Sequence, residues 1–148
     1  MTGVGKQTVP RAIEAFRWCF PAAIVAGIVV TAQRWTVISD NLLRAPATAR
    51  LWWLLPVMAV AGVLFQLLLL WLVLARRSTA ARWLIAALAL FEGIRLLLRF
   101  RDVLAQGGAG GGATYAVAAL LAIAAAALLF TRDGAAWFGR PAPTEEDR

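Results

Sequence analysis

Polar and apolar residues are segregated along this chain into long blocks. Four apolar blocks are separated by short segments, and most of the charged residues lie in these segments and at the two ends of the chain. A helix needs roughly 20 apolar residues to cross the hydrocarbon core of a bilayer, and each block comes close to that length. The pattern therefore predicts an all-α fold, an integral membrane bundle of four transmembrane helices. The predicted transmembrane domain is residues 16–131, with helices at about 16–38, 51–75, 81–101 and 114–131.

Two polar segments flank this domain. Residues 1–15 form a basic cytoplasmic segment, in which Val9 and Ile13 begin a helical repeat of apolar positions. This spacing predicts an amphipathic helix on the membrane surface. Residues 132–148 form a cytoplasmic tail. The first apolar block also fits an alternative interpretation, a signal peptide cleaved after Ala32.

Tryptophans lie near the ends of the blocks. Trp prefers the membrane–water interface, and Trp18 and Trp35 lie about 25 Å apart along a helix that rises 1.5 Å per residue. We expect all seven tryptophans to act as interface anchors: Trp18, Trp35, Trp52, Trp53, Trp71, Trp83 and Trp137.

The fourth block is rich in alanine. Ala118, Ala122 and Ala126 recur every four residues, and small residues at that spacing let helices approach closely in lipid. This predicts a helix-packing face, although alanine-rich composition alone also accounts for the run. The preceding stretch RDVLAQGGAGGGA predicts a flexible loop.

The third block contains charged residues where a membrane helix has few. Glu92, Arg95, Arg99 and Asp102 fall within roughly 80° of one another on a helix with 100° per residue, so they form one polar stripe. Glu92 can meet Arg95 at i+3, as Arg99 can meet Asp102. Gln66 is the only strongly polar side chain of the second block and is a candidate neighbour.

An ionised group near the centre of a membrane helix costs about 2.5–3.5 kcal/mol. We therefore expect Glu92 and Arg95 to neutralise each other and to face the bundle interior or a partner. Three interpretations are open. The pair fixes helix packing, or it forms a polar site in a membrane cavity for an ion, a proton or an anionic headgroup, or it contacts another membrane subunit.

Composition excludes several kinds of chemistry. The chain has one cysteine, Cys19, and no histidine, so it cannot build the usual zinc, haem or copper ligand sets or a Ser-His-Asp or Cys-His catalytic group. We predict no catalytic residue, no metal and no cofactor, and hence not an enzyme.

The net charge of +7 comes almost entirely from arginine. Because the arginines flank apolar blocks, they indicate contact with a lipid bilayer and a fixed topology rather than nucleic-acid binding. Cytoplasmic termini put nine basic residues inside (Lys6, Arg11, Arg17, Arg76, Arg77, Arg82, Arg132, Arg140, Arg148) and five outside (Arg34, Arg44, Arg50, Arg99, Arg101). The count favours both termini in the cytoplasm.

Two stretches, LLLLWLVLARRSTAARW (67–83) and LLFTRDGAAWFGR (128–140), give the chain a likeness to known proteins. Over about half its length it resembles a family of small bacterial four-helix integral membrane proteins of unknown function. Ala80 stands where that family often has tryptophan, and the last block lacks the family's glutamines. The resemblance implies a bacterial inner-membrane protein and no particular activity.

The predicted function is that of a multi-pass inner-membrane accessory or structural subunit, which acts through helix–helix contacts with a membrane protein partner or as a homo-oligomer. The alternative is a small oligomeric transporter or channel-like protein that uses the stripe with Glu92 and Arg95. A carboxylate in the first helix, which marks small multidrug exporters, is missing from the first apolar block.

Overall fold

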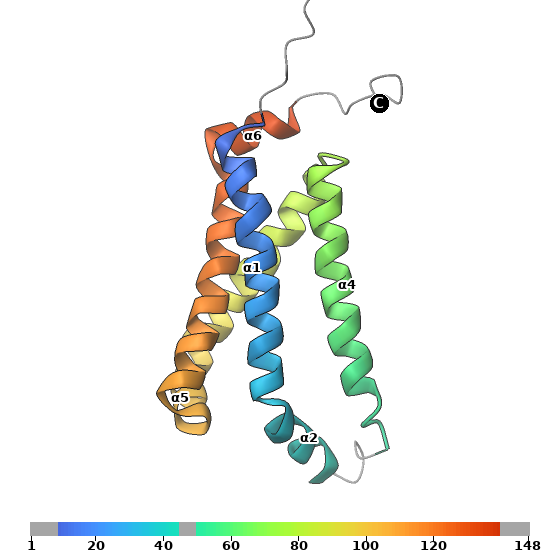
Figure 1. The fold of residues 1–148 in the computed structure, drawn as a ribbon, viewed down its shortest axis with the longest axis vertical. Helices are drawn as coiled ribbons and strands as arrows, with labels where there is room; N and C mark the ends of the chain where they lie inside the picture. Colours follow the sequence, from blue (N-terminus) through green and yellow to red (C-terminus); the bar gives the residue numbers. More distant parts are fainter. Residues whose placement is uncertain (1–8, 45–49, 140–148) are drawn as a thin grey trace, which may run out of the picture.

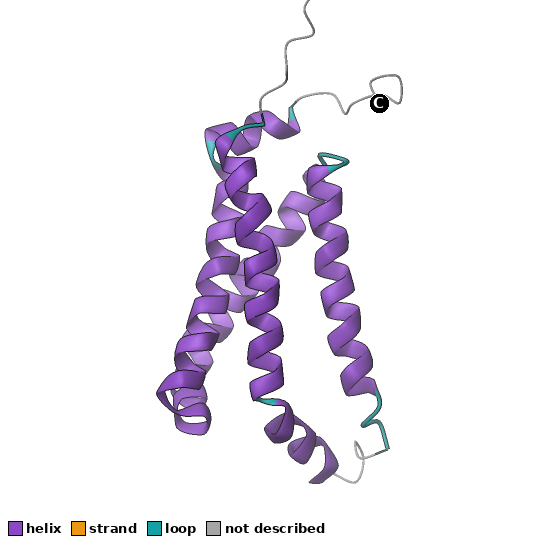
Figure 2. Ribbon diagram, in the orientation of Figure 1, coloured by secondary structure: helices purple, strands orange, loops and turns teal. Residues whose placement is uncertain are grey.

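The computed structural model describes residues 9–44 and 50–139. This part of the chain is helical and contains no strand (Figure 2). Its helices are α1 (Arg11–Gln33), α2 (Trp35–Arg44), α4 (Leu54–Leu74), α5 (Thr79–Phe130) and α6 (Arg132–Phe138). The all-α prediction is therefore confirmed.

Helix α5 reverses direction along its length. The rings of Trp83 and Phe130 lie 5.2 Å apart, although a straight helix would separate these residues by about 70 Å at 1.5 Å per residue. Figure 1 shows a first leg that descends behind α1 and a second leg that returns beside it. The reversal lies in the glycine-rich stretch, which has helical backbone, so the prediction of a flexible loop there is wrong.

Three helical stretches are long and apolar enough to cross a membrane: Arg11–Gln33, Leu54–Leu74 and Gly110–Phe130. They correspond to the first, second and fourth predicted spans. The first leg of α5 is not among them, because three charged residues lie in the 18 positions that follow Arg82. The structure thus gives a helical protein with three candidate membrane spans, compatible with a multi-pass membrane protein.

The limits of the first span differ from the prediction. α1 begins at Arg11, directly after Pro10, and ends at Gln33; a turn at Arg34 then leads into α2. Residues 1–8 of the segment expected to lie on the membrane surface are outside the described residues, and residues 11–15 form the start of α1, where Ile13 is packed and 1% exposed. The described part of the predicted loop after residue 38 is helical as far as Arg44.

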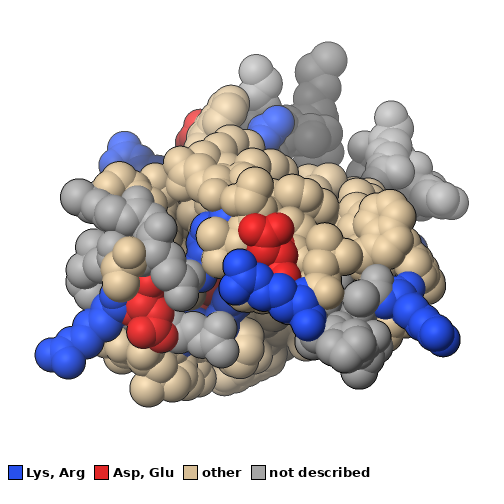
Figure 3. Space-filling model, turned by 90° about the horizontal axis from the view of Figure 1, so that it is seen from below, with Lys and Arg blue, Asp and Glu red and all other residues tan. Residues whose placement is uncertain are grey.

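α1, α4 and the two legs of α5 form a bundle whose ends differ. At one end, here called the upper end, α6 lies across the bundle close to the start of α1 (Figure 1). Both described ends of the chain lie there. The lower end holds α2 and the reversal of α5. Figure 3 shows side chains of both charges exposed at the lower end.

The tightest packing lies in the upper half. Side chains from α1, α4, α5 and α6 form one buried cluster there, which includes Phe16, Leu69, Val73, Ile85, Leu129 and Trp137. Within α4 only Leu69 and Val73 are buried, and both belong to its upper half. α4 is therefore anchored to the bundle at its upper end, while its lower half packs less closely.

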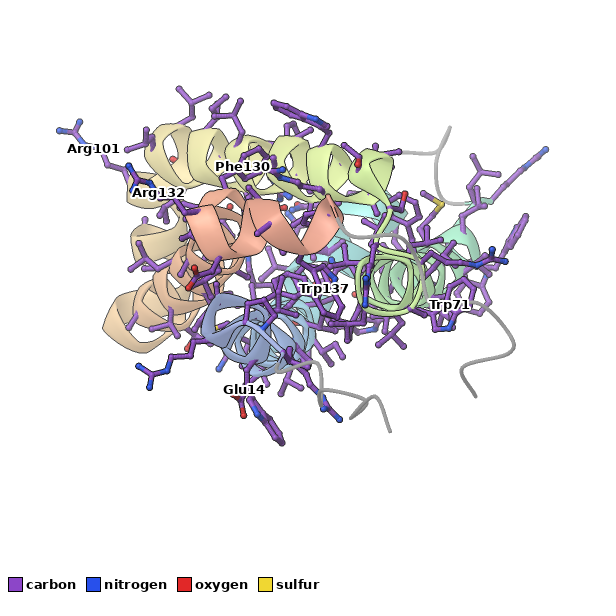
Figure 4. All side chains as sticks on the ribbon, turned by 90° about the horizontal axis from the view of Figure 1, so that it is seen from above. Glu14, Trp71, Arg101, Phe130, Arg132 and Trp137 are labelled. Carbon is purple, nitrogen blue, oxygen red and sulfur yellow. The ribbon has the colours of Figure 1, made fainter. Side chains whose placement is uncertain are left out.

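Helix α6 closes the upper end. Thr131 caps it, because its hydroxyl accepts a hydrogen bond of 3.1 Å from the backbone N–H of Gly134. The indole N–H of Trp137 donates to the carbonyl oxygen of Val73 over 3.2 Å. A helix ends with carbonyls that have no partner within the helix, so Trp137 satisfies one such group of α4. Figure 4 shows Trp137 directed toward α4.

Candidate membrane-embedded binding site

A cavity of about 880 Å³ lies between α1, α4 and both legs of α5. It extends along α1 from Phe20 to Ala32 and reaches Trp35 at the start of α2, so it occupies the part of the bundle below the packed upper core. It exists because α4 is anchored only near its upper end. Pockets of roughly 300–1,000 Å³ are typical of small-molecule sites, and this cavity falls within that range.

Two glycines widen the cavity. Gly27 of α1 and Gly62 of α4 both line it, and a Cβ atom added at either would meet nothing within 4 Å. Small side chains of the second leg of α5, Ala118, Ala119 and Ala122, line the opposite wall. We predicted no role for either glycine from the sequence. The signal was available, since each is the only glycine in its apolar block.

An ion pair lies in this mainly apolar wall. The guanidinium Nη1 of Arg95 donates to the carboxylate Oε1 of Glu92 over 2.9 Å. The pairing expected from the i, i+3 spacing is therefore present. The two side chains are 40% and 36% exposed, so they border open space rather than being enclosed. Phe91 lies on another side of Arg95, with its ring centroid 5.7 Å from the guanidinium carbon.

Polar groups from α1, α4 and the second α5 leg also line the cavity. Gln66 of α4 lines it, as the sequence suggested. Thr31 of α1 and Tyr115 of the second α5 leg line it too, and the sequence analysis missed both. Thr31 donates its hydroxyl proton to the carbonyl of Gly27 over 2.9 Å. Tyr115 is the only tyrosine of the chain and starts its last apolar block, which was a usable signal.

The rest of the predicted stripe is not part of this site. Asp102 is exposed and does not line the cavity. The side chain of Arg99 lies outside the described residues. The described structure thus joins Glu92, Arg95 and Gln66 in one cavity and leaves Asp102 apart.

The predicted alanine face is divided between two environments. Ala118 and Ala122 line the cavity, whereas Ala126 is buried in the core at 7% exposed. The most tightly packed alanines of this leg are Ala119 and Ala125, at 3% and 0% exposed. Ala119 follows Ala118 in the sequence, and Ala125 precedes Ala126. The face of this leg that contacts other helices is therefore wider than the predicted row of alanines at every fourth residue.

The tryptophans also differ among themselves. Six of them are at least 37% exposed: Trp18, Trp35, Trp52, Trp53, Trp71 and Trp83. Figure 4 shows Trp71 pointing outward from α4. Trp137 is 9% exposed and belongs to the core, unlike the other six tryptophans that were predicted as interface anchors. It is buried because α6 folds over the bundle.

Arginines at the upper end contact aromatic rings. The guanidinium carbon of Arg82 lies 4.0 Å from the ring centroid of Phe130 and 5.3 Å from that of Phe138. The guanidinium carbon of Arg77 lies 4.2 Å from the ring centroid of Trp137. Such cation–π contacts are worth roughly 0.5–2 kcal/mol. They tie the turn between α4 and α5 to α6, so these arginines have a structural use.

The chemistry of the cavity follows from its lining residues. Residues 9–44 and 50–139 contain no cluster of three or more Cys, Asp and Glu side chains placed to hold a metal ion. What the geometry offers is a large apolar space with a paired acid and base in its wall.

No model of a known protein family matches the sequence, and neither a curated protein nor a solved structure gives a match.

Proposed function

We propose that this chain is a four-pass protein of a bacterial inner membrane, with both ends in the cytoplasm, that binds a small amphiphilic molecule between its helices. The observation that carries the proposal is the cavity of about 880 Å³ with the Glu92–Arg95 pair in its apolar wall. Most drug-sized ligand sites combine an apolar lining with a few placed polar groups in this way.

The fourth pass is the first leg of α5. Glu92 and Arg95 weigh against its insertion, but their 2.9 Å contact neutralises both charges, and the cavity keeps them from bare hydrocarbon. The two legs run antiparallel in contact, since a Cβ on Gly93 would lie 3.4 Å from Ile123 Cδ1. The second leg is itself apolar enough to span a membrane, so a first leg that crosses beside it packs against another membrane helix.

The size of the cavity argues against a partner helix as its occupant. Along α1 the cavity lining runs from Phe20 to Ala32, a length of about 18 Å at 1.5 Å per residue, whereas a helix that spans the bilayer is roughly 30 Å long. Membrane partners, including a second copy of this chain, would instead contact the outer apolar surface. An accessory role in a larger complex therefore belongs to that surface, and crosslinking in a mild-detergent extract tests it.

Transport is the less favoured function. The cavity ends where the core begins, since Phe20 and Ile85 belong to both. A pathway through one copy would have to cross the packed upper half of the bundle. The geometry therefore supports binding over passage.

Occupancy of the cavity is tested by filling it. Ala118→Leu with Ala122→Leu adds two leucines to its wall, and Ala124→Leu adds one leucine to an exposed position of the same leg. Native mass spectrometry of the full-length protein from a mild detergent should show one bound amphiphile on the parent and on the Ala124→Leu control, and a reduced occupancy on the double variant. Equal occupancy in all three, or none in the parent, contradicts the proposal.

Topology is tested by labelling single cysteines in a Cys19→Ala background with a membrane-impermeant maleimide on intact cells. Ser39→Cys, near the lower end, and Ala105→Cys, near the α5 reversal, should be labelled, and Gly139→Cys should be protected. Labelling of Gly139→Cys with protection of Ala105→Cys would show that the first leg of α5 does not cross.

A further inference from the structure

The binding site is electrically balanced. Among the described residues that line the cavity, Glu92 and Arg95 are the charged side chains. They carry opposite charges and contact each other, so the site has no net charge. Gln66, Thr31 and Tyr115 add polarity without charge.

The pair also keeps hydrogen-bonding capacity beyond its own contact. A guanidinium has five N–H donors and a carboxylate has two acceptor oxygens, whereas one donor–acceptor contact joins these side chains within the described part of the chain. At 40% and 36% exposed, both groups can reach a ligand in the cavity. A ligand that binds both must offer a cationic or donor group to Glu92 and an anionic or acceptor group to Arg95.

A low-dielectric site penalises any charge that is left without a partner. A purely anionic ligand would satisfy Arg95 but would compete with Glu92 for it, and the complex would then hold an excess negative charge. A purely cationic ligand produces the opposite imbalance. A ligand with both charges leaves the site neutral and supplies a partner to each member of the pair.

We infer that the cavity selects a zwitterionic amphiphile, with its ammonium group at Glu92, its anionic group at Arg95 and its single acyl chain in the apolar part of the cavity. This inference rests on the proposed binding function and specifies its ligand class. The volume of about 880 Å³ lies in the range of small-molecule sites, so it suits one small amphiphile.

The inference is tested by changing the charge of the site and the charge of the ligand together. Three amphiphiles with the same acyl chain serve as probes: lysophosphatidylcholine (zwitterionic), lysophosphatidylglycerol (anionic) and an acylcholine (cationic). Binding of each to the full-length protein in nanodiscs is measured by native mass spectrometry or by competition with a spin-labelled lysolipid. The variants are Glu92→Gln, Arg95→Gln and the double exchange.

The parent protein should prefer the zwitterion over either charged probe by about tenfold or more. Glu92→Gln leaves a positive site and should shift the preference toward the anionic probe, and Arg95→Gln leaves a negative site and should shift it toward the cation. The double exchange should lose discrimination by charge. It restores neutrality, so it keeps the test valid if a single variant does not fold.

Failure of this inference is distinct from failure of the binding function. Binding of all three probes with equal affinity by the parent and the double variant would keep the amphiphile site and overturn the ligand class. Selection of the anionic probe by the parent would overturn it as well. Loss of all binding only in the cavity-filling variant, with no change in charge preference among the others, would support the site and refute the role of the pair.

Discussion

Replacing Gly134 by alanine should detach α6 from the bundle. An added Cβ atom would collide with the carbonyl oxygen of Leu128 and would lie 2.8 Å from the carbonyl oxygen of Leu129. Both are backbone atoms of the end of α5, so no side chain can rotate to make room. The first turn of α6 would have to move away from α5 to relieve the contact.

The expected cost follows from what α6 contributes. Forcing extra volume into a packed site typically costs about 1–3 kcal/mol. Movement of α6 also weakens the hydrogen bond from Trp137 to Val73, worth about 0.5–1.5 kcal/mol. Alanine offsets part of this loss, because it favours helix over glycine by about 1 kcal/mol. We expect Gly134→Ala to lower the free energy of unfolding by about 2 kcal/mol.

Unfolding by SDS in mixed micelles, followed by tryptophan fluorescence, measures this change. Gly139→Ala is the matched control, since a Cβ there has the carbonyl oxygen of Ala136 as its nearest neighbour at 3.9 Å. The free energy of unfolding of the control should lie within about 0.5 kcal/mol of the parent's, as is usual for surface substitutions. Equal stability of the two variants would refute the close packing of α6 on α5.

Two further changes test the upper contact and the ion pair. Trp137→Phe removes the donor to Val73 and should cost about 1 kcal/mol, whereas Trp18→Phe at an exposed position should cost little; a difference below the error of SDS unfolding contradicts the contact. Glu92→Gln or Arg95→Gln alone leaves one charge unpaired and should lower the free energy of unfolding by about 2–3 kcal/mol. This figure is below the full cost of a buried charge because both side chains are partly exposed. The double exchange should recover most of that loss, and additive costs in a double-mutant cycle would show that the two residues are not coupled.

Short-range patterns predicted the local parts of this structure well. The i, i+3 spacing of Glu92 and Arg95 is a property of one helix turn, so their contact needed no knowledge of the fold. The apolar blocks likewise predicted the positions of α1, α4 and the last leg of α5, because length and hydropathy decide which helices can span a bilayer.

Features that depend on tertiary contacts were not predictable in the same way. The burial of Trp137 requires α6 to turn back over the bundle, and no periodicity in a seven-residue helix indicates that turn. The helical backbone of the glycine-rich stretch runs against glycine's low helix propensity, so propensity alone did not predict it. Gly27 and Gly62 gain their role only because the lower half of α4 packs loosely against the bundle.

The reversal of α5 has a consequence for biosynthesis. Under the four-pass arrangement, the two legs are joined by a short helical turn and touch along their length, at Trp83 with Phe130 and at Gly93 with Ile123. They can therefore leave the translocon as one hairpin, in which the strongly apolar second leg carries the charged first leg into the lipid. A chain truncated before residue 110 would lose that help, and its first leg should then be retained on the side where it was synthesised.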